Sequence, residues 1–332
     1  MKRKSCLFSL FVLLFSVVTV HSAVAQGFTA LNMERVGYFN VPDIGQDFYV
    51  VADVWGYEGP QGRFALLARS NDGLSIIDIN DPSDPVEVAH LDAIGGDLKD
   101  VKVYDHYAVA VEEYGPLQII DISDPSDPVR VAEVYDYGGA HNVTIHDGMA
   151  FLTGVHQGNG GMRILDLSDP SAPVEIGRFD PYYIHDVALH GTTAYASAVY
   201  FGFLAIVDVS DPTNPREVGR FSTPGHATHH AWSFGDGAYL LVVDETSGGH
   251  VSIWDVSDPA SARLLSEYQV SSGTSVHNPF IIGNTAYLSY YMEGIRVLDL
   301  TDPSNPTELG FFDTNPQNTG SIFTDFWGVF AF

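Results

Sequence analysis

The amino-acid sequence predicts an all-β protein, a β-propeller made of four-stranded antiparallel blades. The first observation is a twelve-residue motif, LQIIDISDPSDP at Leu117–Pro128, which recurs with variations as six copies in the 332-residue chain. The second is the spacing of the copies, whose first aspartates lie 42 to 47 residues apart. The third is that no stretch beyond the N-terminus shows a helical period of apolar residues. A strand-rich unit with this period is typical of a propeller blade.

Each copy of the motif predicts a strand that ends at a turn. The copies begin at Leu74, Leu117, Met162, Leu204, Val251 and Ile295. Apolar residues on both faces are typical of a strand buried on both sides, and Asp-Pro then ends it because proline lacks an N–H donor. Another strand follows each turn, and two strands joined by a turn precede each motif. We expect the first aspartate of the motif, Asp121 and its equivalents, to cap this turn rather than to bind a metal.

The N-terminus predicts a cleaved secretory signal peptide over residues 1–25. Met1–Ser5 is basic, Cys6–Val20 is apolar, and Ala23–Ala25 provides the small residues of a cleavage site. The apolar run is short for a membrane span. The only cysteine, Cys6, leaves with this peptide, which excludes disulfides and thiolate metal sites from the mature chain. We therefore expect a secreted or cell-surface protein with no membrane insertion after cleavage.

The remaining residues, 26–332, are expected to form a single propeller domain. We expect its blades at about 47–91, 97–135, 140–179, 184–221, 228–268 and 276–312. Residues 33–41 (MERVGYFNV) have the pattern of a fourth strand, which would close the ring. Residues 324–332 (TDFWGVFAF) have the pattern of a first strand, as in ADVWGY from Ala52. This arrangement favours seven blades, the last one incomplete at the C-terminus, with six blades as the alternative.

The charge balance limits the class of partner. The formal net charge is −27 at pH 7, and it becomes −30 once the leader with Lys2, Arg3 and Lys4 is removed. Such an acidic surface repels nucleic acid and anionic bilayers. We expect a monomer whose partner is a protein or a glycan at the cell surface.

The repeat also resembles a known family. The motif centres IIDIS, ILDLS and IVDVS are similar to the LVIVD repeat of secreted bacterial propellers. The wider layout is similar to the choice-of-anchor B group, through DVWGY at Asp53–Tyr57, HHAW at His229–Trp232, VVDE ending at Glu245 and FWGVFAF near the C-terminus. The resemblance implies a propeller fold and export rather than a defined activity. No C-terminal anchor of that group is visible in the sequence.

Aligning the first strands of the blades predicts a polar ring at one mouth of the central channel. Candidate ligand-binding residues are Asp53, Lys99, Asp100, His141, Asn142, His185, Asp186, His277 and Asn278. Candidate metal ligands are His229, His230, Asp244 and Glu245. Antiparallel pairing brings the ends of the second strands beside these positions, with Glu112, Glu113, His156, Tyr200, Asp244, Glu245, Tyr290 and Tyr291. Imidazole and carboxylate together suit a divalent cation, Zn or Ca, although hydrogen bonding between blades explains the same residues without a ligand.

Three classes of function remain open from the sequence, of which the third is a purely structural part of a larger surface protein. The first is a binding or scaffold module at the cell surface, with a metal or small ligand at the channel mouth. The second is a hydrolase or lyase that acts on extracellular polysaccharide or another polymer through the same histidines and carboxylates. The sequence contains no G-x-S-x-G, H-E-x-x-H, phosphate-binding glycine loop or EF-hand loop, so the usual motifs of these chemistries do not decide between them.

Overall fold

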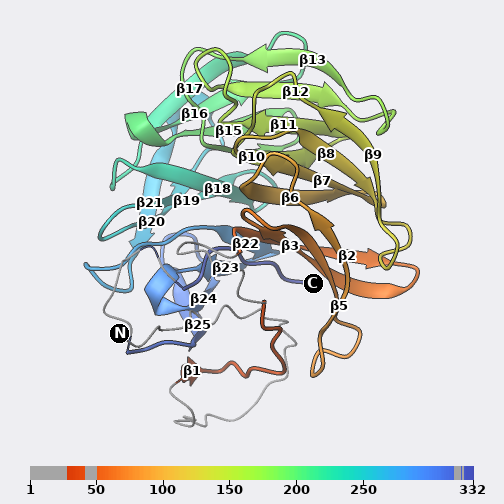
Figure 1. Ribbon diagram of the computed structural model, residues 1–332. Helices are drawn as coiled ribbons and strands as arrows, with labels where there is room; N and C mark the ends of the chain where they lie inside the picture. Colours follow the sequence, from red (N-terminus) through yellow and green to blue (C-terminus); the bar gives the residue numbers. More distant parts are fainter. Residues whose placement is uncertain (1–27, 42–50, 318–322, 324) are drawn as a thin grey trace, which may run out of the picture.

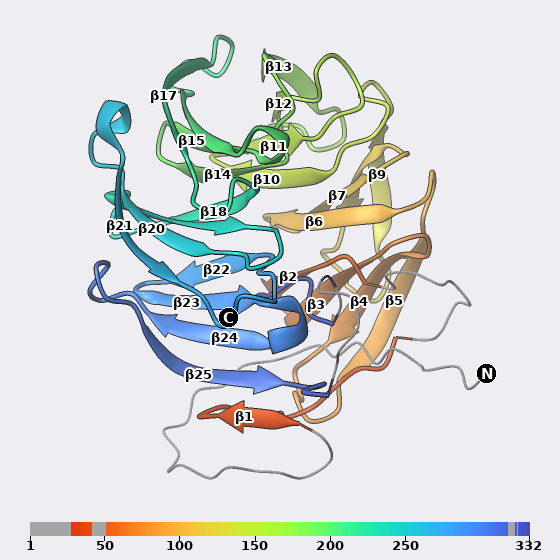
Figure 2. The ribbon, with the colours of Figure 1, turned by 90° about the vertical axis from the view of Figure 1, so that its left-hand side faces the viewer.

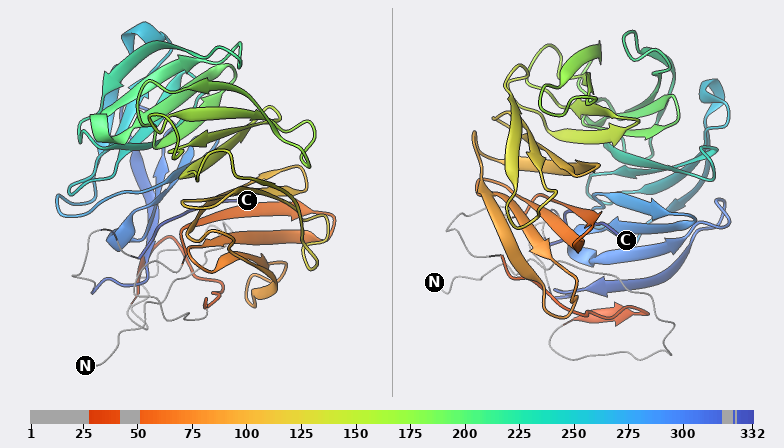
Figure 3. Two further views of the ribbon diagram at one scale, coloured as in Figure 1. Left: turned by 45° about the horizontal axis from the view of Figure 1, so that its top comes forward. Right: turned by 90° about the vertical axis from the view of Figure 1, so that its right-hand side faces the viewer.

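Six antiparallel sheets, five of four strands and one of five, follow one another around a central axis, as Figures 1 and 2 show. The computed structural model describes residues 28–41, 51–317, 323 and 325–332. The expected signal peptide, residues 1–25, lies outside the described residues. The first strand of each sheet lies nearest the axis, and the first strands of blades 1 to 6 contact their neighbours in turn. Figure 3 shows the same succession from two further sides, from orange through green to blue.

The strands of each blade are consecutive in the sequence. Blades 1 and 2 contain β2 (Asp53–Gly59), β3 (Gly62–Arg69), β4 (Gly73–Asp78), β5 (Val86–Asp92), β6 (Leu98–Tyr104), β7 (Tyr107–Glu112), β8 (Leu117–Asp121) and β9 (Val129–Val134). Blades 3 and 4 contain β10 (Asn142–His146), β11 (Met149–Thr153), β12 (Met162–Asp166), β13 (Val174–Phe179), β14 (Asp186–His190), β15 (Thr193–Ala198), β16 (Phe203–Asp208) and β17 (Arg216–Ser222). Blades 5 and 6 contain β18 (Thr228–Phe234), β19 (Tyr239–Asp244), β20 (Val251–Asp255), β21 (Arg263–Tyr268), β22 (Pro279–Ile282), β23 (Thr285–Ser289), β24 (Ile295–Asp299) and β25 (Thr307–Asp313). Three one-turn 3-10 helices connect strands, η1 (Val199–Phe201), η2 (Pro259–Ser261) and η3 (Tyr291–Glu293).

The repeated motif forms the third strand and its turn in every blade. In blade 2, Ile119 and Ile120 are both buried, on opposite faces of β8. Asp121 Oδ1 accepts the N–H of Ser123 (2.8 Å), and Asp124 Oδ1 accepts both the N–H (3.1 Å) and the hydroxyl (2.7 Å) of Ser126. The expectation that these aspartates cap turns is confirmed. The register shifts once between the third and fourth strands of all six sheets, so one β-bulge recurs in each blade.

An N-terminal strand closes the ring, but its position differs from the prediction. The strand is β1 (Thr29–Leu31), which pairs antiparallel with β25 as a fifth strand at the outer edge of blade 6. Residues 33–41 form no strand. Instead Met33 packs on blade 6, whereas Phe39 and Val41 pack on the apolar cluster of blade 1. The segment therefore runs from the last blade to the first and connects them through side-chain packing.

The seven-bladed prediction is not supported, and the six-bladed alternative describes the fold. Residues 325–332 form no strand. They pack between blades 6 and 1, where Phe330 lies 4.7 Å from Phe280 of β22 and 4.9 Å from Trp55 of β2 between ring centroids. The apolar pattern of 324–332 thus reflects burial against two sheets, and Thr324 lies outside the described residues.

The described part of the chain contains no helix that is long and apolar enough to cross a membrane.

Candidate functional site

Four histidines from consecutive blades form a continuous arc at one mouth of the channel. His141, His185, His229 and His277 occupy the equivalent position at or just before the first strands of blades 3 to 6. Their ring centroids are separated by 4.4, 4.3 and 4.4 Å along the arc. Trp327 continues the arc, 4.6 Å from His277. The sequence alignment predicts one polar residue per blade at this mouth. In the structure, the repeat places the four histidines at this position side by side.

A β-bulge directs His229 toward this mouth. In the pairing of β18 with β19, Thr228 faces Asp244 and His230 faces Val243, so His229 is the extra residue. Lys99 is the extra residue at the same place in the pairing of β6 with β7. A bulged residue lacks a cross-strand partner, and the local twist turns its side chain out of the regular alternation. The bulge explains why His229 and His230, although adjacent, serve different parts of the channel.

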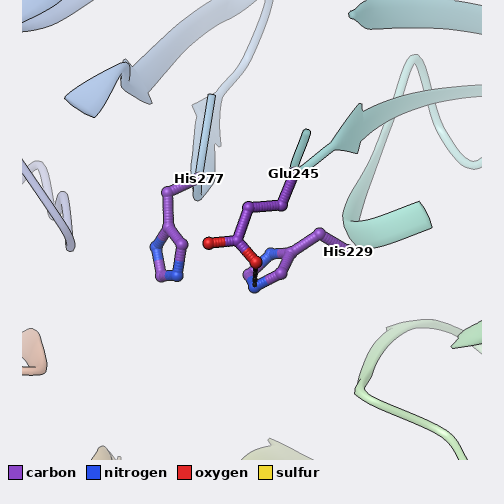
Figure 4. A group of neighbouring side chains, drawn as sticks. All are labelled: His229, Glu245 and His277. Carbon is purple, nitrogen blue, oxygen red and sulfur yellow. Dashed lines mark ion pairs between the residues drawn. The ribbon is translucent and has the colours of Figure 1, made fainter. Parts of the chain in front are cut away.

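His229, Glu245 and His277 form a group that could hold a metal ion (Figure 4). One ligand atom of each lies within 4.8 Å of the other two, and His229 Nε2 is 3.5 Å from Glu245 Oε2. The two histidines are buried, and the Glu245 side chain is 23% exposed. Two imidazoles and a carboxylate, with a fourth position left for water or a ligand, are the donor set of many catalytic zinc sites.

Hydrogen bonds orient the side chains of this group. His277 Nδ1 donates to the carbonyl oxygen of Trp327 (2.7 Å), which leaves Nε2 without a proton when the ring is neutral. The Tyr291 hydroxyl donates to Glu245 Oε1. By contrast, His229 Nδ1 and His185 Nε2 are buried with no hydrogen-bond partner among the described residues. Buried nitrogens without partners are uncommon in native proteins and indicate a site for an ion or water.

Burial keeps the imidazoles neutral. It lowers the pKa of His277 to about 3, although the hydrogen bond to Trp327 opposes the shift. Burial, followed by the neighbouring histidines, lowers the pKa of His229 and of His185 well below the usual value. Burial also raises the pKa of Glu245, although the hydrogen bond from Tyr291 opposes the shift. Neutral imidazole is the metal-binding form of histidine, so His185, His229 and His277 have the form that binds a metal at neutral pH.

The mouth encloses a cavity just large enough for one water-sized group. Its volume is about 10 Å³, and its lining residues are Asp53, Lys99, His141, Asn142, His229, His277, Asn278 and Trp327. A cavity of this size holds about one water molecule, and polar walls favour its occupancy. Asn278 contributes a buried Oδ1 that has no hydrogen-bond partner among the described residues. The cavity therefore suits a single ion or a small polar group.

Comparison with known proteins identifies the family. A model of the LVIVD repeat matches residues 61–93, 95–136, 138–181, 183–223 and 276–314, which together make up more than half of the chain. The chain belongs to the LVIVD-repeat family. No curated protein matches it. The narrower resemblance to choice-of-anchor B proteins stays a prediction.

Solved structures share the fold of this LVIVD propeller at low sequence identity. A functionally unknown protein from Desulfotomaculum acetoxidans superposes with a TM-score of 0.64 at 12% identity, covering 90% of this chain and 94% of its own. A hypothetical selenium-binding protein from Sulfolobus tokodaii gives 0.60 at 14%, covering 80% and 74%. A protein from Lactobacillus plantarum gives 0.60 at 13%, covering 78% and 80%. At these identities the likeness shows the fold alone.

A second carboxylate–imidazole cluster lies on the opposite side of the mouth of the LVIVD propeller. Glu113 Oε2 accepts a hydrogen bond from His141 Nδ1 (2.7 Å), and Glu113 Oε1 accepts one from His156 Nε2 (3.0 Å). Burial opposes ionisation of Glu113, but these hydrogen bonds and nearby Lys99 lower its pKa to about 2. Lys99 Nζ itself pairs with Asp97 (2.9 Å). Glu113 is thus an ionised carboxylate held by two imidazoles.

The structure separates the predicted metal ligands into two groups. Asp244 is fully buried and accepts hydrogen bonds from Thr223 Oγ1 (2.5 Å) and from the N–H groups of Gly225 (2.9 Å) and Ala227 (3.0 Å), so it holds a loop and lies outside the histidine group. His230 pairs with Asp186 in the next layer of the channel. Of the four predicted metal ligands, His229 and Glu245 lie in the group that could hold a metal.

The predicted ligand-binding residues divide in a similar way. His277 belongs to the metal group, and His141, Lys99, Asn142, Asn278 and Asp53 line the mouth cavity. Asp53 and Asp100 both bind Lys102 Nζ, and Asp100 Oδ2 also accepts the N–H of Val143 (2.9 Å). His185 belongs to the arc, where its backbone oxygen accepts a hydrogen bond from Asn142 Nδ2 (3.2 Å).

Three contributors were not among the predicted ligands. Glu113 occupies in blade 2 the place that Glu245 occupies in blade 5, and this equivalence was available from the alignment. Tyr291 was placed at the same face by its strand end but without a role. The Trp327 carbonyl is a backbone group on a segment with no strand, and no sequence pattern could have indicated it.

Proposed function

We propose that this LVIVD propeller is an exported binding module that holds a divalent metal ion at the mouth of its central channel. The convergence of His229, Glu245 and His277 carries the proposal. Two buried neutral imidazoles favour zinc or a similar transition metal over calcium, which prefers oxygen ligands. With three protein ligands, the metal retains an open position for a polar group of a partner.

The surroundings of the mouth support a partner rich in hydroxyl groups, such as a glycan. Tyr200 is 76% exposed, Phe201 56% and Tyr114 68%. Tyr200 packs on Tyr183 (4.8 Å between centroids), whose hydroxyl lies 3.4 Å from His185 Nδ1. Exposed aromatic rings beside convergent polar groups are typical of a binding site rather than of bare surface. The acidic charge of the chain disfavours nucleic acid and anionic membranes as partners.

The proposed location is outside the cell or at its surface. It is supported by the basic, apolar and small-residue segments of residues 1–25. We further propose that the mature protein acts as a monomer, in which the N-terminal strand pairs within its own chain.

Metal content is the decisive test. Purified protein, stripped with a chelator and titrated with zinc in a calorimeter, is expected to bind about one equivalent. His229→Ala and His277→Ala are each expected to abolish this binding. His106→Ala is the matched control, because His106 is a partly exposed histidine whose Nδ1 pairs with Asp105 outside the site. A wild-type protein that binds no metal, or variants that bind as the wild type does, would reject the proposal.

A hydrolase or lyase remains the second candidate, and the Glu113 cluster is the observation that favours it. A carboxylate that holds two imidazoles resembles the orienting part of a general-base unit. Screening of polysaccharides and esters with the wild type and with Glu113→Gln tests this candidate. Turnover that falls at least about a hundredfold in the variant supports it. Absence of turnover on every substrate leaves the binding module.

A further inference from the structure

A second cavity lies further along the channel, toward the C-terminal ends of the first strands, and is distinct from the mouth. Its volume is about 230 Å³, and it is lined by residues of the first strands of blades 1 to 5. Trp55, Val103, Ile145, Leu189 and Trp232 supply its apolar walls. None of its lining residues belongs to the mouth cavity. A space of this size exceeds the cavity of about 150 Å³ that accommodates benzene in an engineered protein.

The one lysine at this cavity has no hydrogen-bonding capacity left for an anion. Lys102 Nζ donates to Asp53 Oδ2 (2.9 Å), to Asp100 Oδ1 and to the Val101 carbonyl (3.3 Å). Its ammonium also lies 4.6 Å from the centroid of the Trp55 ring. An ammonium has three N–H groups, and three acceptors use them. The lysine is therefore a structural cation and not an anchor for a bound carboxylate.

Four other polar residues line the cavity, Thr144, His146, His230 and Ser233, and two of them, Thr144 and His230, offer hydrogen-bond acceptors. Thr144 Oγ1 uses its proton on the Val187 carbonyl (2.7 Å), so only its lone pairs remain. His230 Nδ1 lies against Oδ2 of Asp186, a buried carboxylate, but the two atoms do not have the geometry of a hydrogen bond. A carboxylate beside Nδ1 favours the tautomer that carries its proton there, which leaves a lone pair on Nε2. A ligand that contacts Thr144 and His230 must therefore bring a hydrogen-bond donor.

The charge around the cavity also selects the ligand. Burial raises the pKa of Asp53, but the carboxylates of Asp100 and Asp186 still outnumber the single lysine of this layer, within a chain of formal net charge −27. Two indole rings, those of Trp55 and Trp232, border the same space. Indole faces attract cations, and the attraction grows when the cation is desolvated. Anions are disfavoured by both features.

We propose that this inner cavity binds a small organic cation, a protonated primary amine carried on an apolar body of about the size of a phenyl group. The ammonium donates to His230 Nε2 within the field of Asp186, and the apolar body packs against Trp232 and Leu189. The site is independent of the metal proposed at the mouth.

A set of three matched ligands tests the proposal. Phenethylamine, 2-phenylethanol and 3-phenylpropionate share a phenyl ring on a short chain and differ in the charge of their end group. Titration followed by tryptophan fluorescence is expected to show binding at least about tenfold tighter for the amine than for the alcohol, and none for the carboxylate at millimolar concentration. Trp232→Phe is expected to remove most of the signal, whereas Trp254→Phe, a buried indole outside the channel lining, keeps it.

Substitution of Asp186 tests the origin of the preference. Asp186→Asn keeps the oxygen that accepts the Val187 N–H (2.6 Å) but removes the charge, so the amine is expected to bind about as weakly as the alcohol. Asp105→Asn is the control, an exposed carboxylate paired with His106, which lines neither cavity. His229→Ala is expected to keep the amine preference, which separates this proposal from the metal site. Equal binding of the three ligands to the wild type, or tighter binding of 3-phenylpropionate, overturns the proposal. This result needs no variant.

Discussion

Asp244 and Glu245 are adjacent residues for which the structure predicts opposite consequences of substitution. Asp244 is fully buried and accepts three hydrogen bonds, from Thr223 Oγ1 and from the N–H groups of Gly225 and Ala227. Hydrogen bonds to a charged group contribute about 1.5–3 kcal/mol each. In Asp244→Ala, water can partly replace the acceptor for the two part-buried N–H groups, so we expect a total loss of about 4 kcal/mol in the free energy of unfolding.

Glu245→Ala is expected to change the stability little and to abolish zinc binding. Glu245 accepts one described side-chain hydrogen bond, from Tyr291, and its burial raises the pKa, so its ionised form contributes little to the stability of the metal-free protein. We expect a change of less than about 1 kcal/mol in the free energy of unfolding, together with loss of zinc binding.

Urea denaturation followed by circular dichroism, combined with zinc calorimetry on each folded variant, measures both quantities. Asp244→Ala is expected to shift the urea midpoint strongly while the folded fraction still binds zinc. Asp244→Asn, which keeps one acceptor oxygen, is expected to fall between it and the wild type. An Asp244→Ala protein of wild-type stability that has lost zinc binding would refute the assignment of Asp244 to the loop.

Four further predictions follow from the same structure. Zinc affinity measured from pH 7 to pH 4 is expected to fall as Glu245 protonates, at a pKa raised by burial, and Glu245→Gln, which removes the carboxylate ligand, is expected to bind zinc weakly throughout this range. In the metal-free protein, burial holds the pKa of His277 near 3, against about 6.5 in an unfolded chain, so the free energy of unfolding is expected to fall as the pH drops from about 6.5 toward 3. Phe326→Ala is expected to lower the free energy of unfolding, measured in urea, by about 3 kcal/mol, because this ring is buried between the C-terminal segment and blade 6. Lys102→Met is expected to cost about 3–5 kcal/mol in the same assay, since it leaves Asp53 and Asp100 without their cation, and added Asp53→Asn is expected to restore part of the loss.

The blades could be predicted because each repeat carries its own start and stop signals. A buried run such as Leu117–Asp121 ends at an Asp-Pro turn, and the six copies of this motif define the blade as the repeating unit. The closure of the ring could not be predicted in the same way. Residues 33–41 and 325–332 have strand-like apolar patterns, but such a pattern records burial and does not reveal whether a neighbouring strand offers hydrogen bonds. The actual strand, β1, is only three residues long and too short for any pattern to indicate.

The histidine arc could be predicted because one position per blade is a property of the alignment. The roles of the carboxylates could not, because they depend on local backbone geometry. Glu112 and Glu113 were equivalent candidates by position, as were Asp244 and Glu245. In the structure Glu112 accepts the N–H groups of Ile94 (2.8 Å), Gly95 (2.5 Å) and Gly96 (2.8 Å), the same loop-holding role that Asp244 has in blade 5. The second acid of each pair points the other way, toward the histidines.

This alternation places two carboxylate–imidazole units at the mouth, and they differ in how well the protein compensates the carboxylate charge. The difference indicates where a metal would bind. Glu113 already has His141 and His156 as hydrogen-bond donors, and its pKa of about 2 shows that its charge is well satisfied. Glu245 has a single described hydrogen-bond donor and a raised pKa, so its charge lacks a cation. His229, beside it, has a buried Nδ1 without a partner among the described residues. A divalent ion would stabilise the second unit far more than the first, because only there does it supply the positive charge that the protein does not.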